Sequence, residues 1–202
     1  MLLDATESQL VLIDYQTALM PAMVDSAAVL ANALRLGQMA ALLEVPAWAT
    51  EQNPSKLGRN VEGISTLGLR TLSKMHFSAM EEGLGEWLRP PSKPVAGNAR
   101  SLPKHLQRAS QEPPQRNAIV LAGCEAHVCL LQTALDCLED EFEVWVVTDA
   151  CSSRTERSRD AAFDRLAGAG AELVTTEMVA FEWLRGAEHP LPTRRCPPLS
   201  ER

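Results

Sequence analysis

The segment that most constrains the fold is a strand followed at once by a helix, between Asn117 and Asp136. The β-favouring run Ala118 to Leu121 is followed by a pair of small residues, Ala122 and Gly123. The apolar stretch from about Ala126 to Leu138 is long enough for more than three helical turns. In an open α/β fold, residues that follow such a strand lie at the carboxyl edge of a parallel sheet, where ligands bind. We therefore expect a functional site just after residue 123.

The same alternation of strand and helix runs along most of the chain. Short apolar runs predict strands at 8–14, 45–50, 69–73, 118–121, 143–148 and 172–175. Between and after them, helices are predicted at 25–43, 78–88, 126–138, 155–169 and 177–185, with Asp25 or Ser26 capping the first. Six strands alternating with helices predict an α/β fold of three layers, a doubly wound and mostly parallel six-stranded sheet with right-handed crossovers.

Three stretches depart from this alternation. Residues 89–116 contain six prolines and many basic residues, which indicates an excursion from one domain spanning 1–188, with one or two helical turns near 102–109. This excursion could equally pack on a partner subunit. Residues 60–67 are predicted to be irregular, and residues 189–202 to form an extended tail.

Composition and charge narrow the class of protein. The formal net charge of -7 argues against nucleic acid or an anionic membrane as the main partner. No apolar run approaches the roughly 20 residues that span a bilayer. The first ten residues carry acidic side chains and no basic region, unlike a secretory signal, so we expect a cytoplasmic protein. Five irregularly spaced cysteines indicate free thiols and not a disulfide framework.

Three predicted strand ends bring Asp14, Lys74 and Cys129 to the same edge of the sheet. A lysine ammonium and the start of a helix both favour a thiolate over a thiol, which makes Cys129 the best candidate nucleophile. A carboxylate can accept the thiol proton and pass it to a leaving amine. Backbone N–H groups of Glu125 and Cys129 could form an oxyanion hole. This combination suits acyl transfer through a thioester.

Other polar residues at this edge are candidates for binding a substrate or for structure. We expect the side chains of Gln16, Glu51, Gln52 and His76 to line a substrate pocket, although a structural role for His76 is as plausible. His127 precedes Cys129 by two residues and would point to a different helix face, so it is predicted to pack or cap and not to form a dyad. Asp149 is predicted to fix the loop after the fifth strand.

The sequence offers little support for a metal or cofactor site. The loop after the second strand has one carboxylate and no histidine, and the chain has no C-x-x-C, H-E-x-x-H or Gly-rich phosphate loop. We therefore expect neither a metal nor another cofactor.

Three motifs resemble those of the isochorismatase-like, or cysteine hydrolase, superfamily. That family carries D-x-Q, K-x-x-x-S-A and G-x-x-T-x-x-C-V-x-x-T-A, and this chain has related runs at 14–16, 74–79 and 123–134. The resemblance covers nearly the whole chain and is closest to isochorismatase-domain-containing proteins of unassigned substrate. It implies a Rossmann-like sheet, a dimer or higher assembly, and Asp14, Lys74 and Cys129 as a catalytic triad. It also implies that Cys129 and not Cys124 is the nucleophile, with a cis peptide at Cys124–Glu125.

Two departures from the family pattern bear on the substrate. Nicotinamidases carry an aspartate and histidines that bind metal after the second strand, and residues 50–57 have none of them. Ala126 replaces the threonine of G-x-x-T-x-x-C, which removes a polar contact beside the nucleophile.

The residues and the resemblance together predict a cysteine hydrolase that cleaves a small amide or related C–N bond. In this interpretation Cys129 attacks, Lys74 stabilises the thiolate and Asp14 shuttles the proton. The alternative is a catalytically silent small-molecule-binding or scaffold protein of the same fold. A weaker alternative is a redox-responsive thiol protein that uses Cys124 and Cys129.

Overall fold

Six parallel strands form a single sheet in the order β3-β2-β1-β4-β5-β6. The computed structural model describes residues 2–90 and 116–188. Successive strands run outward from β1 to one edge, and the chain then returns to β4 on the other side of β1. The carboxyl ends of β1 and β4 therefore form the switch point at which such sheets bind ligands. The strands are β1 (Ser8–Ile13), β2 (Ala47–Gln52), β3 (Arg70–Lys74), β4 (Ala118–Gly123), β5 (Glu143–Val147) and β6 (Glu172–Val174).

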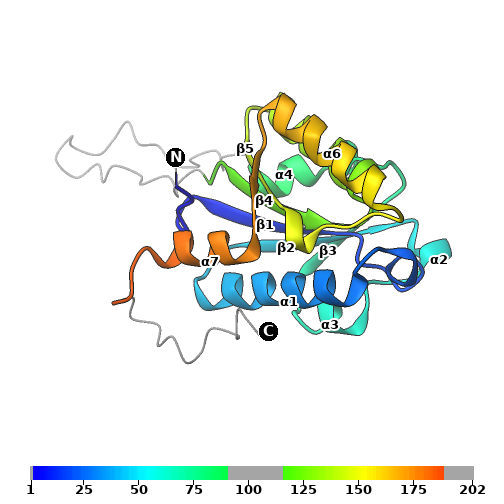
Figure 1. The fold of residues 1–202 in the computed structure, drawn as a ribbon, viewed down its shortest axis with the longest axis horizontal. Helices are drawn as coiled ribbons and strands as arrows, with labels where there is room; N and C mark the ends of the chain where they lie inside the picture. Colours follow the sequence, from blue (N-terminus) through cyan, green and yellow to red (C-terminus); the bar gives the residue numbers. More distant parts are fainter. Residues whose placement is uncertain (1, 91–115, 189–202) are drawn as a thin grey trace, which may run out of the picture.

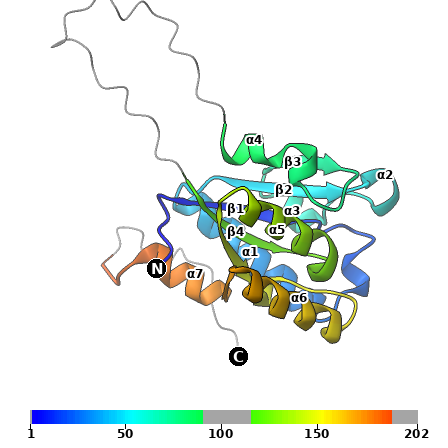
Figure 2. The same cartoon turned by 90° about the horizontal axis from the view of Figure 1, so that it is seen from above.

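Helices cover both faces of the sheet, which confirms the predicted three layers (Figure 1). One face carries α1 (Ser26–Leu42), α3 (Glu62–Ser65) and α7 (Thr176–Leu184). The other carries α4 (Leu84–Leu88), α5 (Leu131–Glu139) and α6 (Glu156–Ala169), with α5 between the other two (Figure 2). Short turns of helix complete the fold: η1 (Met20–Ala22), α2 (Pro54–Leu57), η2 (Met80–Glu82), η5 (Ala126–Leu130) and η6 (Thr148–Ala150). Within the described residues, no helix has both the length and the apolar character needed to cross a membrane.

The two central strands explain why the sequence specifies this sheet. All six residues of β1 and all six of β4 are buried, because helices cover both faces and each strand has a neighbour on either side. Such strands need continuous apolar runs and not an alternating pattern. The buried polar residue Gln9 on β1 is satisfied, since its Nε2 donates to the carbonyl oxygens of Leu88 and Arg116 at 2.7 and 2.9 Å.

Several predicted boundaries were wrong for local reasons. The helix expected over 78–88 is broken by Gly83, whose φ of 88° ends η2 and starts α4. The stretch 60–67 is not irregular throughout, because α3 forms within it. Asp25 precedes α1 but makes no side-chain capping bond, and it has a left-handed φ of 51°. The predictions for 91–115 and for the tail from residue 189 lie outside the described residues, and the extent of the domain stays a prediction.

Gly123 at the end of β4 allows the two central strands to approach closely. A Cβ atom built on Gly123 would lie 2.5 Å from the carbonyl oxygen of Ile13 and 2.6 Å from its Cβ. The nearest obstacle is backbone of a buried strand, which cannot move aside easily. A glycine is therefore required where β1 and β4 deliver their residues to the site.

We expect Gly123→Ala to lower the free energy of unfolding by roughly 1–3 kcal/mol, because the added methyl overpacks the junction of β1 and β4. Urea unfolding followed by circular dichroism measures this change. Gly168→Ala in α6 is the matched control, since a Cβ there meets nothing within 4 Å. That control should stabilise the protein by roughly 0.5–1 kcal/mol. Equal stability of the two variants would contradict the steric argument.

Candidate active site

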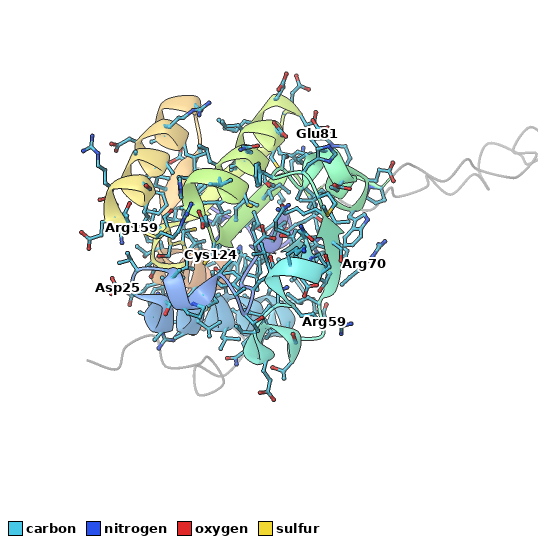
Figure 3. All side chains as sticks on the ribbon, turned by 90° about the vertical axis from the view of Figure 1, so that its right-hand side faces the viewer. Asp25, Arg59, Arg70, Glu81, Cys124 and Arg159 are labelled. Atoms are coloured by element: carbon cyan, nitrogen blue, oxygen red, sulfur yellow. The ribbon has the colours of Figure 1, made fainter. Side chains whose placement is uncertain are left out.

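The structure brings Asp14, Lys74 and Cys129 together, as the sequence predicted. Asp14 directly follows β1, Lys74 is the last residue of β3, and Cys129 lies in η5 after β4. Asp14 Oδ2 and Lys74 Nζ are 2.8 Å apart, and both side chains are completely buried. The charges of Asp14 and Lys74 both act on the pKa of the Cys129 thiol, so the thiol lies near both side chains. Figure 3 looks onto this edge of the sheet, with Cys124 near the middle of the view and Arg59 and Arg70 to one side.

The buried ion pair is held by neighbours from three strand ends. Lys74 Nζ has three oxygen neighbours at 2.7–2.9 Å, which are Asp14 Oδ2, Gln52 Oε1 and the carbonyl oxygen of Phe77. An ammonium group has three N–H donors, so each donor has an oxygen to face. The other oxygen of Asp14 accepts a hydrogen bond from Thr50 Oγ1 at 2.7 Å. Burying a charge is costly unless it is paired and hydrogen-bonded, and here both conditions are met.

The pKa of the Cys129 thiol is shifted in the direction opposite to the prediction. Cys129 is only 4% exposed, and this burial, followed by the charge of Asp14, raises the pKa of its thiol to about 12. Lys74 acts in the opposite direction but does not prevail. The direction of this shift is opposite to the expected stabilisation of a thiolate, because burial disfavours the charged form more than one ammonium favours it. Near neutral pH the thiol of Cys129 is therefore neutral.

The turn between β4 and η5 has the backbone geometry that the family resemblance implied. The Cys124–Glu125 peptide is cis. The turn is tied to the segment after η6, since Ala126 N donates to the carbonyl oxygen of Ser152 at 2.7 Å and Ser152 N donates to that of Gly123 at 3.2 Å. The role of the Glu125 and Cys129 amides as an oxyanion hole stays a prediction.

Side chains on the outer side of this turn interact with one another. The carboxylate of Glu125 accepts from Arg154 Nε and Nη2 at 2.9 and 3.1 Å. His127 Nδ1 lies 2.9 Å from Ser153 Oγ, and its Nε2 lies 3.6 Å from Glu125 Oε2. This placement agrees with the packing role predicted for His127.

Gln16 and Gln52 belong to the framework of the site and not to an open pocket wall. Gln16 is completely buried, and its Oε1 accepts from Gln52 N at 2.8 Å while its Nε2 donates to the carbonyl oxygens of Gln52 and Gly58. Gln52 uses Oε1 for Lys74 and donates from Nε2 to the carbonyl oxygen of Met75 at 2.8 Å. Their amide groups are engaged by the protein, and a substrate contact for these two residues stays a prediction.

Glu51 lies on the opposite face of the sheet from Lys74. Side chains alternate along a strand, so Glu51 and Gln52 of β2 point in opposite directions. Glu51 Oε1 accepts from Asn60 N at 2.8 Å and lines a pocket of about 560 Å³ together with Arg59 and Ser73. The structure therefore does not bring Glu51 to the group formed by Asp14, Lys74 and Cys129.

His76 lies in the loop between β3 and η2, at the surface. It lines a pocket of about 520 Å³ with Phe77 and Gln132, and its Nδ1 is 2.9 Å from Glu82 Oε1. Hydrogen bonds from the backbone of His76 and Met75, and then from the His76 ring, hold the pKa of Glu82 at about 2. These contacts are complete above the ordinary carboxyl pKa and are lost as pH falls through 2. A substrate contact for His76 stays a prediction.

Two other polar side chains have structural roles at or near this edge. Asp149 Oδ1 accepts from Thr176 N and Oγ1 at 2.8 and 2.9 Å, which confirms that it fixes the segment after β5. Thr50, which the sequence analysis did not single out, orients the Asp14 carboxylate. Thr50 is the β2 residue that pairs with Ile13 of β1. This contact could therefore be inferred only once the strand register was known.

In the part of the chain that the structure describes, no group of three or more His, Cys, Asp or Glu residues is arranged to hold a metal ion. Cys124, Cys129, Cys137 and Cys151 are free and buried.

We expect Lys74→Met to lower the free energy of unfolding by roughly 3–5 kcal/mol, because it leaves the buried carboxylate of Asp14 without its cation. The double variant Lys74→Met/Asp14→Asn should recover a large part of the loss, since it removes the unpaired charge. Urea unfolding at pH 7 measures both. A single variant as stable as the natural protein would contradict a buried, paired Lys74.

Comparisons with known proteins agree with this fold. A family model described as the isochorismatase domain matches residues 99–178. Isochorismatase domain-containing protein 2 of Rattus norvegicus is 33% identical over 183 residues, which are 91% of this chain and 76% of that protein. The MAR1 ribonuclease structure from Caenorhabditis elegans is similar with a TM-score of 0.78 and 29% identity, covering 94% of this chain and 88% of that one. The YcaC gene product of Escherichia coli, an octameric hydrolase of unknown specificity, has a TM-score of 0.74 at 23% identity and covers 92% and 83% of the two chains. The chain therefore belongs to the isochorismatase domain family.

Proposed function

We propose that this protein is a cysteine hydrolase that cleaves a small amide or related C–N bond through a thioester on Cys129. Membership of the isochorismatase family supports a hydrolase-type function. The observation that carries the finer proposal is the completely buried Asp14–Lys74 ion pair beside a nearly buried thiol. A buried ion pair next to a thiol stabilises the fold little compared with apolar packing, so a catalytic role accounts for it better.

The first half of the reaction follows from the protonation state of the site. The thiol is neutral at rest, so its proton passes to Asp14 as sulfur attacks the substrate carbonyl carbon. The carbonyl oxygen becomes an oxyanion, to which the amides of Glu125 and Cys129 donate. Asp14 then gives the proton to the nitrogen of the leaving amine, and the C–N bond breaks. The products of this half are the amine and an acyl thioester on Cys129.

The second half regenerates the thiol. Asp14 accepts a proton from water as the water oxygen attacks the thioester carbon, and the proton then returns to the departing sulfur. The second product is a carboxylic acid. Lys74 stays charged throughout and stabilises the negative charge as it moves between Asp14 and sulfur, which are both its neighbours.

Ala126 bears on which amide is cleaved. It is completely buried at the start of η5, directly after Glu125, at the position where the family pattern has threonine. An alanine at this position offers the substrate a methyl group in place of a hydroxyl. We therefore favour an acyl group that presents an apolar surface to this turn over one that needs a hydrogen bond there.

Assembly and location follow the same interpretation. The octameric hydrolase from Escherichia coli supports a homo-oligomer. Free, buried thiols fit a reducing compartment, which supports a cytoplasmic location. The molecule that binds to the site is a small-molecule substrate. The structural relative from Caenorhabditis elegans is named a ribonuclease, whereas the net charge of -7 opposes binding of RNA.

The proposal is tested by incubating the protein with a panel of small primary and secondary amides and with an RNA oligonucleotide. The release of ammonia, amine or nucleotide is measured. The natural protein should cleave at least one amide, and Cys129→Ala should lower that rate by at least about 10³-fold because the nucleophile is gone. Mass spectrometry should find the acyl group on Cys129. Cys137→Ala is the matched control, since Cys137 is a buried cysteine on α5 whose pKa is also raised to about 12.

Three results would contradict the proposal. Full amide turnover by Cys129→Ala would exclude the thioester. Binding of an amide without turnover, unchanged in Cys129→Ala, would favour the small-molecule-binding protein. Cleavage of RNA alone would replace the substrate class.

A further inference from the structure

We infer that Thr133 and Asp136 of α5 are positioning residues that hold the loop Met75–Ala79 and, through the carbonyl of Phe77, the Lys74 ammonium. This inference rests on the proposed function for its catalytic meaning. The hydrogen bonds that carry it are a separate observation.

The loop Met75–Ala79 starts directly after Lys74 and folds back toward it. Its near end is fixed by other residues, because Glu82 Oε1 accepts from the N–H groups of Met75 and His76 at 2.7 and 3.0 Å. The carbonyl oxygen of Met75 accepts from Gln52 Nε2 at 2.8 Å. At the middle of the loop, the carbonyl oxygen of Phe77 accepts from Lys74 Nζ at 2.9 Å.

The far end of the loop is fixed by α5. Ala79 N donates to Thr133 Oγ1 at 3.0 Å, and the hydroxyl of Ser78 donates to the carboxylate of Asp136. Ala79 and Thr133 are completely buried, so no solvent is available to replace the Thr133 hydroxyl as an acceptor. A buried N–H without a partner is costly, and the loop would have to move to avoid it.

Cys129 lies in η5, and α5, which carries Thr133 and Asp136, follows η5 without a break. The loop is therefore tied to the helix that continues directly from the thiol. Of the three oxygens around Lys74 Nζ, those of Asp14 and Gln52 come from β1 and β2, whereas the Phe77 oxygen depends on the loop.

This dependence matters because β3 lies at the edge of the sheet. Lys74 is the last residue of a strand that has a neighbour on one side only, namely β2. An edge strand is held by half as many ladder hydrogen bonds as a central one. The tie through Thr133 and Phe77 supplies a second attachment for the end of the strand, on the side of the thiol.

The test measures Lys74 directly and does not require a substrate. With ¹⁵Nζ-labelled lysine, a buried and fully hydrogen-bonded ammonium gives a slowly exchanging NMR signal, which Lys74→Met identifies by its loss. The chain has four lysines, Lys56, Lys74, Lys93 and Lys104, so assignment is simple.

Thr133→Val keeps the shape of the side chain but cannot accept from Ala79 N. We expect it to speed hydrogen exchange of the Lys74 ammonium at least tenfold and to shift its ¹⁵N resonance. Thr133→Ser, which restores the hydroxyl, should stay within twofold of the natural protein. Thr71→Val is the matched control, because Thr71 lies on the exposed part of β3 and its hydroxyl only donates to the carbonyl oxygen of Leu69.

Ser78→Ala provides a second variant in case Thr133→Val does not fold, since it removes the other tie to α5. It should produce the same change in the Lys74 signal in a smaller amount. An unchanged Lys74 signal in whichever of the two variants folds would overturn the inference.

The amide panel separates this result from the proposed function. If Lys74 responds as expected and an amide substrate is found, kcat should fall in Thr133→Val and recover in Thr133→Ser with little change in KM. If Lys74 responds but no amide is cleaved, the positioning role stands and the proposed reaction fails.

Discussion

The arrangement of the candidate site depends on one ion pair that is removed from water, between the Lys74 ammonium and the Asp14 carboxylate. Two such charges are stable in the interior only if nearly every donor and acceptor around them is matched. This requirement explains several neighbours that otherwise look unrelated. Thr50 has to supply a hydroxyl, Gln52 an amide oxygen and Phe77 a backbone carbonyl. The architecture meets the requirement by ending β1, β2 and β3 at the same level.

The ion pair also affects the pKa of the Cys129 thiol. The two charges act on Cys129 in opposite senses, so their effects partly cancel, and burial decides the outcome. The resting thiol of Cys129 is therefore neutral. A neutral, buried thiol does not present a permanent thiolate to oxidants.

Much of the fold could be predicted from sequence because its strongest features are local. β1 and β4 are continuous apolar runs, and the observed strands differ from the predicted ones by no more than two residues at these positions. The failures required knowledge of the backbone or of distant contacts. No apolar pattern shows that Gly83 adopts a left-handed conformation that divides a helix.

The candidate site likewise has features that the sequence predicts and features that it does not. The positions of Asp14, Lys74 and Cys129 follow from where strands end, which the sequence shows. The direction of the pKa shift at Cys129 does not, because charge and helix position are visible in a sequence whereas burial is a property of the assembled fold. Gln16 and Gln52 were placed at the correct edge, but whether an amide faces a ligand or a neighbouring strand is decided by tertiary structure.

The position of Lys74 on an edge strand has a consequence for how relatives of this protein can change. Side chains alternate along β3, so a shift of one residue in its pairing with β2 would move the ammonium to the other face of the sheet. The connection between the two strands, residues 53–69, has no influence on this alternation. A single residue gained or lost inside β3 would instead present Ser73 or Met75 where the ammonium belongs, so the position of Lys74 constrains the length of this five-residue strand.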